Sequence, residues 1–262
     1  MPKLSIVTVN LDNVNGLRKT IESVINQTLS DYEYIIIDGG SNDGSVDVIN
    51  EYADKITYWE SKPDKGIYNA MNKGLKQATG DIVTFLNSGD NYCSPSSLET
   101  TVQCIKDKFS CAELFFFDYI NQSDTSDRLI SSSDVINKFI ISKKGFGHPS
   151  TFYKRSLFGF MGLFDERFKI SADRAFYMEA IVKNRVAYAY FPFTISVFHD
   201  GGLSTDYKNK NIIREEERII IDTYYSGFEK MIVKNRVFRK LLSIKILNNF
   251  FLTLLSWKLN RT

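Results

Sequence analysis

The chain has 262 residues, of which 43% are hydrophobic, and it carries a formal net charge of +2 at pH 7. This length and hydrophobic content can bury one substantial α/β core, so we expect one domain with an extension rather than several domains. The small net charge and the lack of any repeat or low-complexity segment give no sign of a nucleic-acid partner.

Strands and helices alternate through the first part of the chain. Residues 3–10 are a mainly apolar run typical of a buried strand, and residues 14–28 place apolar side chains at helical spacing. Residues 32–38 predict a second strand that ends at Asp38. A Gly/Ser/Asn/Asp loop then leads into a second helical pattern over residues 46–53.

Two further strands continue this alternation. Residues 56–60 predict a short strand, and after a Pro-Asp-Lys-Gly turn a helix is expected over residues 67–78, stopping at Gly80. The next apolar run breaks into a polar loop that ends in Asp90. Strands in β-α alternation imply a parallel sheet covered by helices, which binds ligands beyond the carboxyl ends of its strands. Asp38 and Asp90 both lie at such ends.

The loop Asn87-Ser88-Gly89-Asp90 has two interpretations. Asn-Ser-Gly-Asp is ordinary turn chemistry. A carboxylate delivered into a loop by an apolar strand also suits a hard cation or a sugar hydroxyl.

The rest of the chain carries fewer patterns. Residues 114–119 predict a strong strand, and the Ser/Asp-rich stretch after it predicts a hairpin or a mobile loop. His148 lies in GFGHPSTFYKRSLF, and a lone histidine is more often a structural hydrogen-bonding residue than a catalytic one. His199 lies in FHDGGLST, a Gly-rich loop after a strand, which is either a flexible ligand-contacting loop or a plain turn around Gly201 and Gly202.

Five segments occur in a fixed order: SIVTVN, IIIDGGSNDGS, KPDKGIYNAMNKGLKQATGD, FLNSGD and SADRAF. Together they resemble the inverting glycosyltransferases of family 2, of the type that builds bacterial surface polysaccharides, over about three quarters of the chain. The resemblance implies the nucleotide-sugar-binding GT-A fold. This is an α/β, Rossmann-like fold with a mixed, mainly parallel sheet flanked by helices, and we expect a C-terminal helical extension in addition.

The resemblance also implies a binding site for a nucleotide-sugar donor. The end of the first strand would line the nucleotide pocket, with Asp38 reading the base and Asp43 in the loop beside it. The implied donor-binding residues are Thr8, Asn10, Asp38, Asp43, Asn72, Asn87, Ser88, Gly89 and Asp90.

A divalent cation is implied at the same place. Asn87 to Asp90 stands where the family usually has Asp-x-Asp, so Asp90 would hold Mn²⁺ or Mg²⁺ between the two phosphates of the donor. Such a cation stabilises the negative charge of the leaving nucleoside diphosphate. Asn87 replaces the first acid of the motif, which leaves the metal site one charge short of the common pattern.

Asp173 matches the catalytic base of the family. It would deprotonate an acceptor hydroxyl as that oxygen attacks the anomeric carbon, and a single displacement of this kind inverts the anomeric configuration. The alternative is that Asp173 is a helix N-cap. The resemblance places His148 facing the active site and a loop near His199 over the donor diphosphate, whereas Arg174 departs from the acid or aromatic residue usual beside the base.

The end of the chain differs from the rest in charge. Residues 230–262 contain eight Lys/Arg and no Asp/Glu, interleaved with large apolar residues, so this segment predicts a basic amphipathic helix or helix pair on an anionic membrane surface. Its longest uncharged stretch is 12 residues, well short of the ~20 that a spanning helix needs. The alternative is a helix packed on the catalytic domain or on a second subunit. We therefore divide the chain into a transferase domain, residues 1–225, and a helical tail, residues 226–262.

Within the transferase domain, residues 1–112 would bind the donor and residues 113–225 the acceptor.

The cysteines and the early first strand indicate where in the cell the protein is expected. Cys93, Cys104 and Cys111 are odd in number and lack metal-ligand spacing, which argues against zinc and suits free thiols in a reducing cytoplasm. No signal peptide is expected. The predicted location is cytoplasmic, with peripheral contact to the inner face of the membrane.

The expected activity is that of an inverting, hexosyltransferase-type enzyme. It would move a sugar from a nucleotide-diphosphate donor, with a UDP-sugar expected, to a hydroxyl of a glycan or a polyprenyl-diphosphate-linked saccharide during cell-envelope polysaccharide synthesis. Whether the protein forms a homodimer is left open. One alternative is a nucleotidyltransferase, although LDNVNGLRKT is a poor Gly-rich phosphate loop. The other is a degenerate scaffold of the same fold, which the Asn87 substitution brings into consideration.

Overall fold

The computed structural model describes residues 3–123, 125–132, 141–142, 145–227 and 229–230. Over these residues the chain forms one nine-stranded mixed sheet with the order β3-β2-β1-β4-β8-β6-β9-β5, and β7 pairs with β6 outside this path. The strands are β1 (Leu4–Asn10), β2 (Tyr32–Asp38), β3 (Tyr58–Ser61), β4 (Ile82–Phe85), β5 (Asn91–Tyr92), β6 (Leu114–Gln122), β7 (Asp127–Ile130), β8 (Thr151–Lys154) and β9 (Tyr188–His199). The helices are α1 (Val14–Ile25), α2 (Ser45–Glu51), η1 (Ala53–Lys55), α3 (Ile67–Gln77), α4 (Ser97–Lys108), η3 (His148–Ser150), α6 (Arg155–Met161), α7 (Ala172–Tyr177), η4 (Met178–Lys183), η5 (Tyr207–Asn209) and α8 (Lys210–Tyr224).

The first four strands form the parallel half of the sheet. β1 lies between β2 and β4, and Asn10 stands opposite Asp38 in the register. The predicted alternation of strands and helices up to Asp90 is confirmed, with α1 ending at Ile25, where Asn26 closes it, rather than near residue 28. Because parallel strands end at one edge, Asp38 and the loop before Asp90 share the carboxyl edge of the sheet.

The second half of the sheet is mixed. β8 runs antiparallel between β4 and β6, whereas β9 runs parallel to β6 and antiparallel to the short β5. The pairing of β5 with β9 brings Asn91 opposite Val197 and so carries the end of β9 to the carboxyl edge. The predicted α/β class, with a mixed and mainly parallel sheet flanked by helices, is confirmed.

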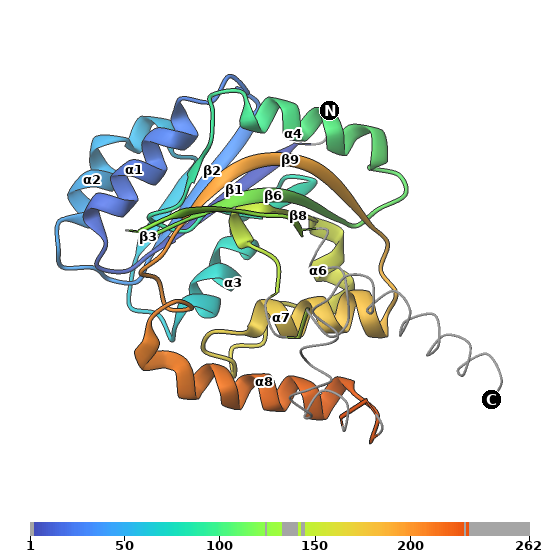
Figure 1. The fold of residues 1–262 in the computed structure, drawn as a ribbon. Coiled ribbons are helices and arrows are strands. Elements are labelled where there is room, and N and C mark those ends of the chain that lie inside the picture. Colours follow the sequence, from blue (N-terminus) through green and yellow to red (C-terminus); the bar gives the residue numbers. More distant parts are fainter. Residues whose placement is uncertain (1–2, 124, 133–140, 143–144, 228, 231–262) are drawn as a thin grey trace.

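Helices cover both faces of the sheet (Figure 1). α1, α2 and α4 pack on one face, where Ile6 and Ile36 join their apolar side chains. α3, α6 and α7 pack on the other, where Val7 and Ile35 lie, and α8 forms an outer layer below α7. Strands buried on both faces read as continuous apolar runs instead of alternating ones. This is why residues 3–10 and 32–38 carry such a strong strand signal.

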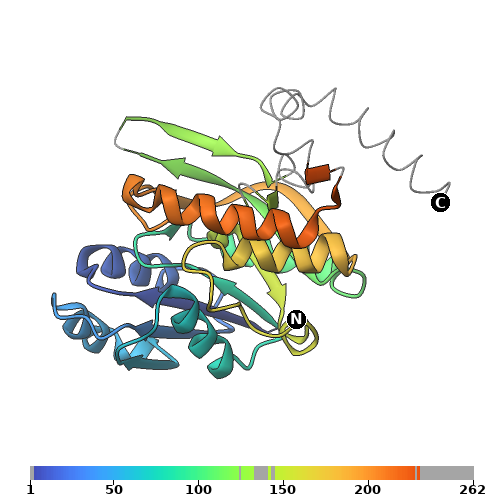
Figure 2. The same cartoon turned by 90° about the horizontal axis from the view of Figure 1, so that it is seen from below.

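Three expectations about the second half can now be compared with the structure. The Ser/Asp-rich stretch does form a hairpin, because β6 continues to Gln122 and turns into β7, and this hairpin extends beyond the helical layer (Figure 2). His199 is the last residue of β9 rather than part of a loop, because its pairing with Gln122 extends the strand. Ser171, not Asp173, occupies the N-cap position of α7, so the alternative role of Asp173 as an N-cap is wrong.

The basic segment predicted as an amphipathic tail, residues 231–262, lies outside the described residues. Among the helices that the structure describes, none has both the length and the apolar character required to cross a bilayer.

Candidate active site

Asp38, at the end of β2, is a buried carboxylate held by five donors. It accepts hydrogen bonds from Asn10 Nδ2 (2.7 Å), Ser41 Oγ (2.6 Å) and Ser61 Oγ (2.6 Å), and from the backbone N–H groups of Ser41 and Gly40. Burial alone would raise the pKa of Asp38, but the hydrogen bonds from Ser41 and Ser61 outweigh it and lower the pKa. The Oδ1 atom of Asn10 is buried and has no hydrogen-bond partner in the described part of the chain, so it is available to a ligand.

Two other predicted donor-binding residues make contacts inside the protein. Thr8 is fully buried, and its hydroxyl donates to the Leu86 carbonyl (2.7 Å). Asp43 is exposed and accepts hydrogen bonds from the Val14 N–H (2.7 Å) and the Ser45 hydroxyl (2.6 Å) at the starts of α1 and α2. Both residues therefore shape the edge of the sheet around Asn10.

The loop between β4 and β5 is fixed from α1. Gly89 adopts a φ of 104°, in the left-handed region that favours glycine, and its N–H donates to the Thr20 hydroxyl (2.9 Å). The same hydroxyl donates to the backbone carbonyl of Asp90 (2.7 Å), and Asn13 Nδ2 donates to the Ser88 carbonyl (3.1 Å). These contacts turn the chain so that the Asp90 side chain is delivered to the carboxyl edge.

The Asp90 carboxylate is buried with little compensation. Only 4% of the residue is exposed, and among the described residues its carboxylate accepts one hydrogen bond, from the His199 backbone N–H (3.2 Å). Burial raises the pKa of Asp90 to about 8, opposed by that hydrogen bond and by the charge of Lys19. The His199 ring contacts Lys19 Nζ (2.6 Å) and Asn91 Oδ1 (2.9 Å), and Asn87 Oδ1 is buried without a partner among the described residues.

These residues fit a divalent cation. Asp90 is a buried carboxylate whose pKa stays raised despite the charge of Lys19, and the Asn87 amide oxygen on the same loop has no partner among the described residues. Both are hard oxygen ligands of the kind that Mg²⁺ and Mn²⁺ prefer. Within the described residues no cluster of three His, Cys, Asp or Glu side chains is preformed for a metal. Asp90 and Asn87 would therefore hold the cation only together with oxygen atoms from a ligand.

Asp173 lies in the first turn of α7, at the centre of a second group of residues. Its Oδ1 atom accepts a hydrogen bond from the Tyr68 hydroxyl (3.0 Å), and its Oδ2 atom lies 3.7 Å from His148 Nε2. Arg174, next to it, is 6% exposed and donates to the Ser171 hydroxyl. The structure therefore brings Asp173 and His148 together, while Arg174 binds the start of its own helix.

His148 is enclosed by aromatic rings. Its ring centroid lies 5.8 Å from that of Phe85, 5.9 Å from that of Phe164 and 6.5 Å from that of Tyr68. Neither ring nitrogen has a hydrogen-bond partner in the described part of the chain. Burial lowers the pKa of His148, and the charge of Asp173 only partly opposes this, so the ring is neutral at pH 7.

Tyr119, on β6, is influenced by the charges of both acidic groups. Burial raises the pKa of its hydroxyl to about 12, and the charges of Asp90, Asp173 and Asp200 act in the same direction. The charges of both predicted functional carboxylates therefore act on this one hydroxyl. The sequence offered one signal for this residue, a tyrosine beside Asp118 at the end of the predicted strand 114–119.

Asn72, a predicted donor-binding residue, instead connects two segments. Its amide donates to the Phe164 carbonyl (2.9 Å) and to Glu166 Oε1 (2.9 Å), and accepts from the Phe164 N–H (3.0 Å). Asn69 donates to the other oxygen of Glu166 (2.9 Å). These bonds fix α3 to the chain that leads into α7.

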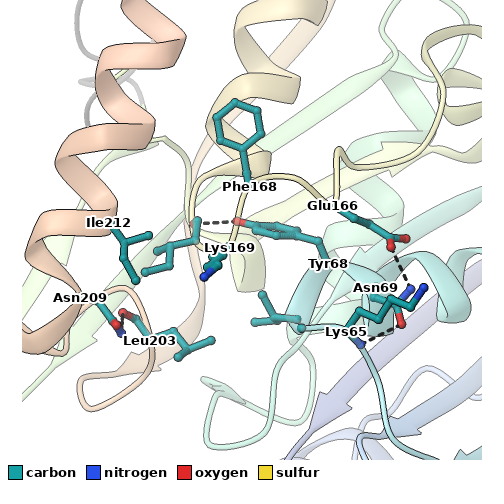
Figure 3. A pocket seen from close by; sticks show the side chains of 12 residues that line it. Lys65, Tyr68, Asn69, Glu166, Phe168, Lys169, Leu203, Asn209 and Ile212 are labelled. Atoms are coloured by element: carbon teal, nitrogen blue, oxygen red, sulfur yellow. Dashed lines mark hydrogen bonds between the residues drawn. The ribbon is translucent and has the colours of Figure 1, made fainter.

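A cavity of about 220 Å³ opens beside this junction (Figure 3). Tyr68 forms part of its wall, so the cavity lies against the residue that contacts Asp173. The other lining residues come from the start of α3, from the segment before α7 and from the region at the start of α8: Lys65, Gly66, Ile67, Asn69, Glu166, Phe168, Lys169, Ile170, Leu203, Asn209 and Ile212.

Comparison with known proteins gives consistent matches. The family model described as Glycosyl transferase family 2 matches residues 5–168. An uncharacterized glycosyltransferase of Mycobacterium tuberculosis is 33% identical over 187 residues, covering 68% of this chain and 69% of that protein. The PGL/p-HBAD biosynthesis glycosyltransferase of Mycobacterium bovis is 27% identical and covers 99% of both chains. Poly(ribitol-phosphate) beta-N-acetylglucosaminyltransferase TarP of Staphylococcus aureus is 26% identical over 83% of this chain and 64% of that protein.

Solved structures share the fold. Residues 1–349 of S. aureus TarS, in complex with UDP-GlcNAc, match with a TM-score of 0.66 at 16% identity, over 95% of this chain and 75% of that chain. Against the longer TarS structure, this chain spans 46% of the length. A mannosyltransferase from Pyrobaculum calidifontis, in complex with GDP-Man and Mn²⁺, matches with a TM-score of 0.60 at 12% identity, over 94% of this chain and 84% of that chain.

Proposed function

Since the chain belongs to glycosyltransferase family 2 and is a glycosyltransferase, we propose that it transfers a sugar from a nucleoside diphosphate sugar to a hydroxyl group, with inversion. The observation that carries the proposal is the pair Asp90 and Asp173. The charges of both carboxylates raise the pKa of Tyr119. Asp90 lies in the β4–β5 loop that fits a cation, and Asp173 lies on α7, where it contacts Tyr68 in the wall of the cavity.

The donor binds at the carboxyl ends of β1, β2 and β4. Asn10 Oδ1, buried and unpartnered, accepts an N–H from the base, and Asp38 holds the Asn10 amide in the orientation that allows this. A UDP-sugar is the proposed donor, which the UDP-GlcNAc complex of TarS supports. Because the mannosyltransferase of the same fold binds GDP-Man, the base has to be tested directly.

Asp90 and Asn87 would hold Mn²⁺ or Mg²⁺ together with the donor diphosphate. The Mn²⁺ in the mannosyltransferase complex supports a cation in this fold, and the buried, uncompensated Asp90 supports this position for it. When bound, the cation offsets the negative charge that develops on the leaving nucleoside diphosphate. Lys19, near Asp90, adds positive charge on the same side.

Asp173 acts as the general base. It takes the proton of the acceptor hydroxyl while that oxygen forms its bond to the anomeric carbon and the bond to the diphosphate breaks. Neutral His148 and the rings around it keep water away from one side of the carboxylate. A single displacement inverts the anomeric configuration.

The acceptor binds in residues 113–225 and in the cavity of Figure 3, between Lys169 and the start of α3. We propose a glycan or a lipid-linked saccharide in polysaccharide or glycolipid biosynthesis, which the names of the mycobacterial and staphylococcal relatives support. Two lysines and one glutamate line the cavity, Lys65, Lys169 and Glu166, and this excess of positive charge favours an acceptor with negative charge.

The test is Asp173→Asn, because an amide cannot accept the proton. Turnover is expected to fall by ~10² or more while the affinity for the donor stays within about 2-fold. Steady-state kinetics and calorimetric donor binding measure the two quantities. Asp54→Asn, an exposed position on η1, is the matched control and should leave both unchanged. Wild-type turnover in Asp173→Asn would remove Asp173 from the mechanism.

A further inference from the structure

Tyr68 connects Asp173 to the segment that precedes α7. The residue lies in the first turn of α3 and is 4% exposed, and its single hydroxyl proton is shared between the Ile170 carbonyl (2.7 Å) and Asp173 Oδ1 (3.0 Å). Figure 3 shows the ring reaching from α3 to the segment before α7. Burial, followed by the charge of Asp173, raises the pKa of Tyr68 well above its ordinary value, so the hydroxyl stays protonated and remains a donor.

Glu216 holds the other side of the same peptide segment. It is 6% exposed, on the inner face of α8, and its carboxylate accepts hydrogen bonds from the backbone N–H groups of Lys169 and Ile170 (3.2 Å for Ile170). Hydrogen bonds to an ionised acceptor are about twice as strong as neutral ones. Ile170 is thus fixed at its N–H by Glu216 and at its carbonyl by Tyr68, three residues before Asp173.

The two oxygens of Asp173 differ as a result. Oδ1 is occupied by Tyr68, whereas Oδ2 has no hydrogen bond among the described residues. Oδ2 faces Gly145, where an added Cβ would lie 3.3 Å from it. Any side chain at that position would therefore crowd the oxygen.

We infer that Tyr68 and Glu216 are positioning residues, which together orient the Asp173 carboxylate so that Oδ2 receives the acceptor proton. This inference rests on the proposed role of Asp173 as the base. Neither residue touches the reacting atoms: Tyr68 acts through Asp173 Oδ1 and the Ile170 carbonyl, and Glu216 acts through the Ile170 N–H. Glu216 also lies beyond the region that the family model matches.

Other groups around Asp173 do not replace this hydrogen bond. His148 Nε2 on η3 is 3.7 Å from Asp173 Oδ2, too far for a hydrogen bond, and the Arg174 guanidinium donates to Ser171 at the start of the same helix. The charge of Asp173 raises the pKa of three further hydroxyls, which make no hydrogen bond to it among the described residues: those of Tyr119, Tyr153 and Tyr177.

The first test is Tyr68→Phe, which removes the hydroxyl and keeps the ring. Loss of one hydrogen bond to a charged group should lower kcat about 10-fold, with donor affinity within about 2-fold of wild type. The acid limb of the kcat–pH profile should move to higher pH, because the ionised carboxylate loses a donor that stabilised it. A purely structural tyrosine would not move that limb.

Tyr32→Phe is the matched control for this test. Its hydroxyl also donates to a backbone carbonyl, that of Val24 (3.1 Å), but at the other end of the sheet. It should leave kcat and the pH profile unchanged. Wild-type kcat and an unshifted acid limb in Tyr68→Phe would overturn the inference.

Glu216→Gln tests the second half, with exposed Glu215→Gln on the same helix as its control. The Glu216 variant should lower kcat in the same direction and leave donor affinity unchanged. Because both residues act through Ile170, the double variant should lose less than the product of the single losses. If the fold losses in kcat of the two single variants simply multiply in the double variant, the two residues act independently and the inference that they act together is contradicted.

Asp173→Asn, measured beside these variants, separates two kinds of failure. If Asp173→Asn turns over like wild type, the proposed function fails. If Asp173→Asn is slow while Tyr68→Phe and Glu216→Gln behave like wild type, only the positioning inference fails.

Discussion

Asp38 and Asp90 are both buried at the carboxyl edge of the sheet, yet their ionisation differs. Five hydrogen-bond donors surround Asp38 and lower its pKa, whereas Asp90 receives one and its pKa rises to about 8. Asp38 is therefore a fixed anion within the protein. Asp90 needs positive charge from outside to stay ionised at neutral pH.

This difference predicts the behaviour of Asp90→Asn. In its native environment Asp90 binds its proton more tightly than in the unfolded chain, so stability falls as pH rises from about 4 through about 8. The substitution removes this loss. In EDTA, the thermal unfolding midpoint of Asp90→Asn minus that of wild type should therefore increase from pH 5 to pH 8.

The same variant should lose the Mn²⁺-dependent part of nucleoside diphosphate binding. Adding Mn²⁺ with the diphosphate should raise the unfolding midpoint of wild type and of the Asp54→Asn control, but not that of Asp90→Asn. Equal metal-dependent stabilisation of all three proteins would count against Asp90 as the metal ligand.

Single residues could be predicted from the sequence only as far as the family pattern reached. Asp90 and Asp173 carry their signal in local motifs, and the structure puts both near Tyr119. Tyr68 and Glu216 carry no such signal, because their partners lie 105 and 47 residues away. Of three consecutive glutamates in α8, nothing in their sequence says that the middle one is buried.

At the scale of elements, α3 is packed unusually close to β1. A Cβ built at Gly74 in the middle of this helix would lie 2.4 Å from Val7 Cγ1. Alanine normally stabilises a helix interior by ~1 kcal/mol relative to glycine. At Gly74 the added methyl group would instead push α3 away from the sheet, and Tyr68, on the same helix, would move with it.

Gly74→Ala should therefore lower the free energy of unfolding, by about 1–3 kcal/mol, as overpacking does in other cores. Denaturant unfolding measures this. Gly159→Ala in α6, where a Cβ would meet nothing within 4 Å, is the matched control and should be neutral or slightly stabilising. A Gly74→Ala protein as stable as that control would mean that the helix–sheet spacing is adaptable.

Elements were more predictable in the first half of the chain than in the second. The β-α alternation up to Asp90 follows from local apolar periodicity. The placement of β8 between β4 and β6, and the end of β9 against Asp90, depend on pairings between distant strands. Strand length at His199 was missed for that reason, since pairing with β6 rather than local composition extends β9.

At the scale of the molecule, two groups of residues on one sheet would bind two substrates. The parallel half carries Asn10, Asp38 and Asp90, and the helices under the mixed half carry Asp173 and one wall of the cavity (Figures 1 and 3). We propose the division into a donor part, residues 1–112, and an acceptor part, residues 113–225, on this basis. The basic segment beyond residue 230 stays a prediction.

That segment predicts a measurable association with membranes. Deleting residues 231–262 should reduce sedimentation with liposomes that contain anionic lipid, most clearly at low salt, because screening weakens attraction between surface charges. Liposomes of neutral lipid are the control. A truncated protein that sediments as well as the full chain would instead favour packing of the segment on the catalytic domain or on a second subunit.

The central claim is that this glycosyltransferase binds a nucleoside diphosphate through Asp90 and a divalent cation. Calorimetric titration of the purified protein with UDP, GDP and dTDP, each with Mn²⁺ and then with EDTA, tests it most directly. Selective binding of one diphosphate, UDP on this account, that disappears in EDTA is the expected result. Binding of none of the three, or binding of equal strength with and without the metal, would contradict the account.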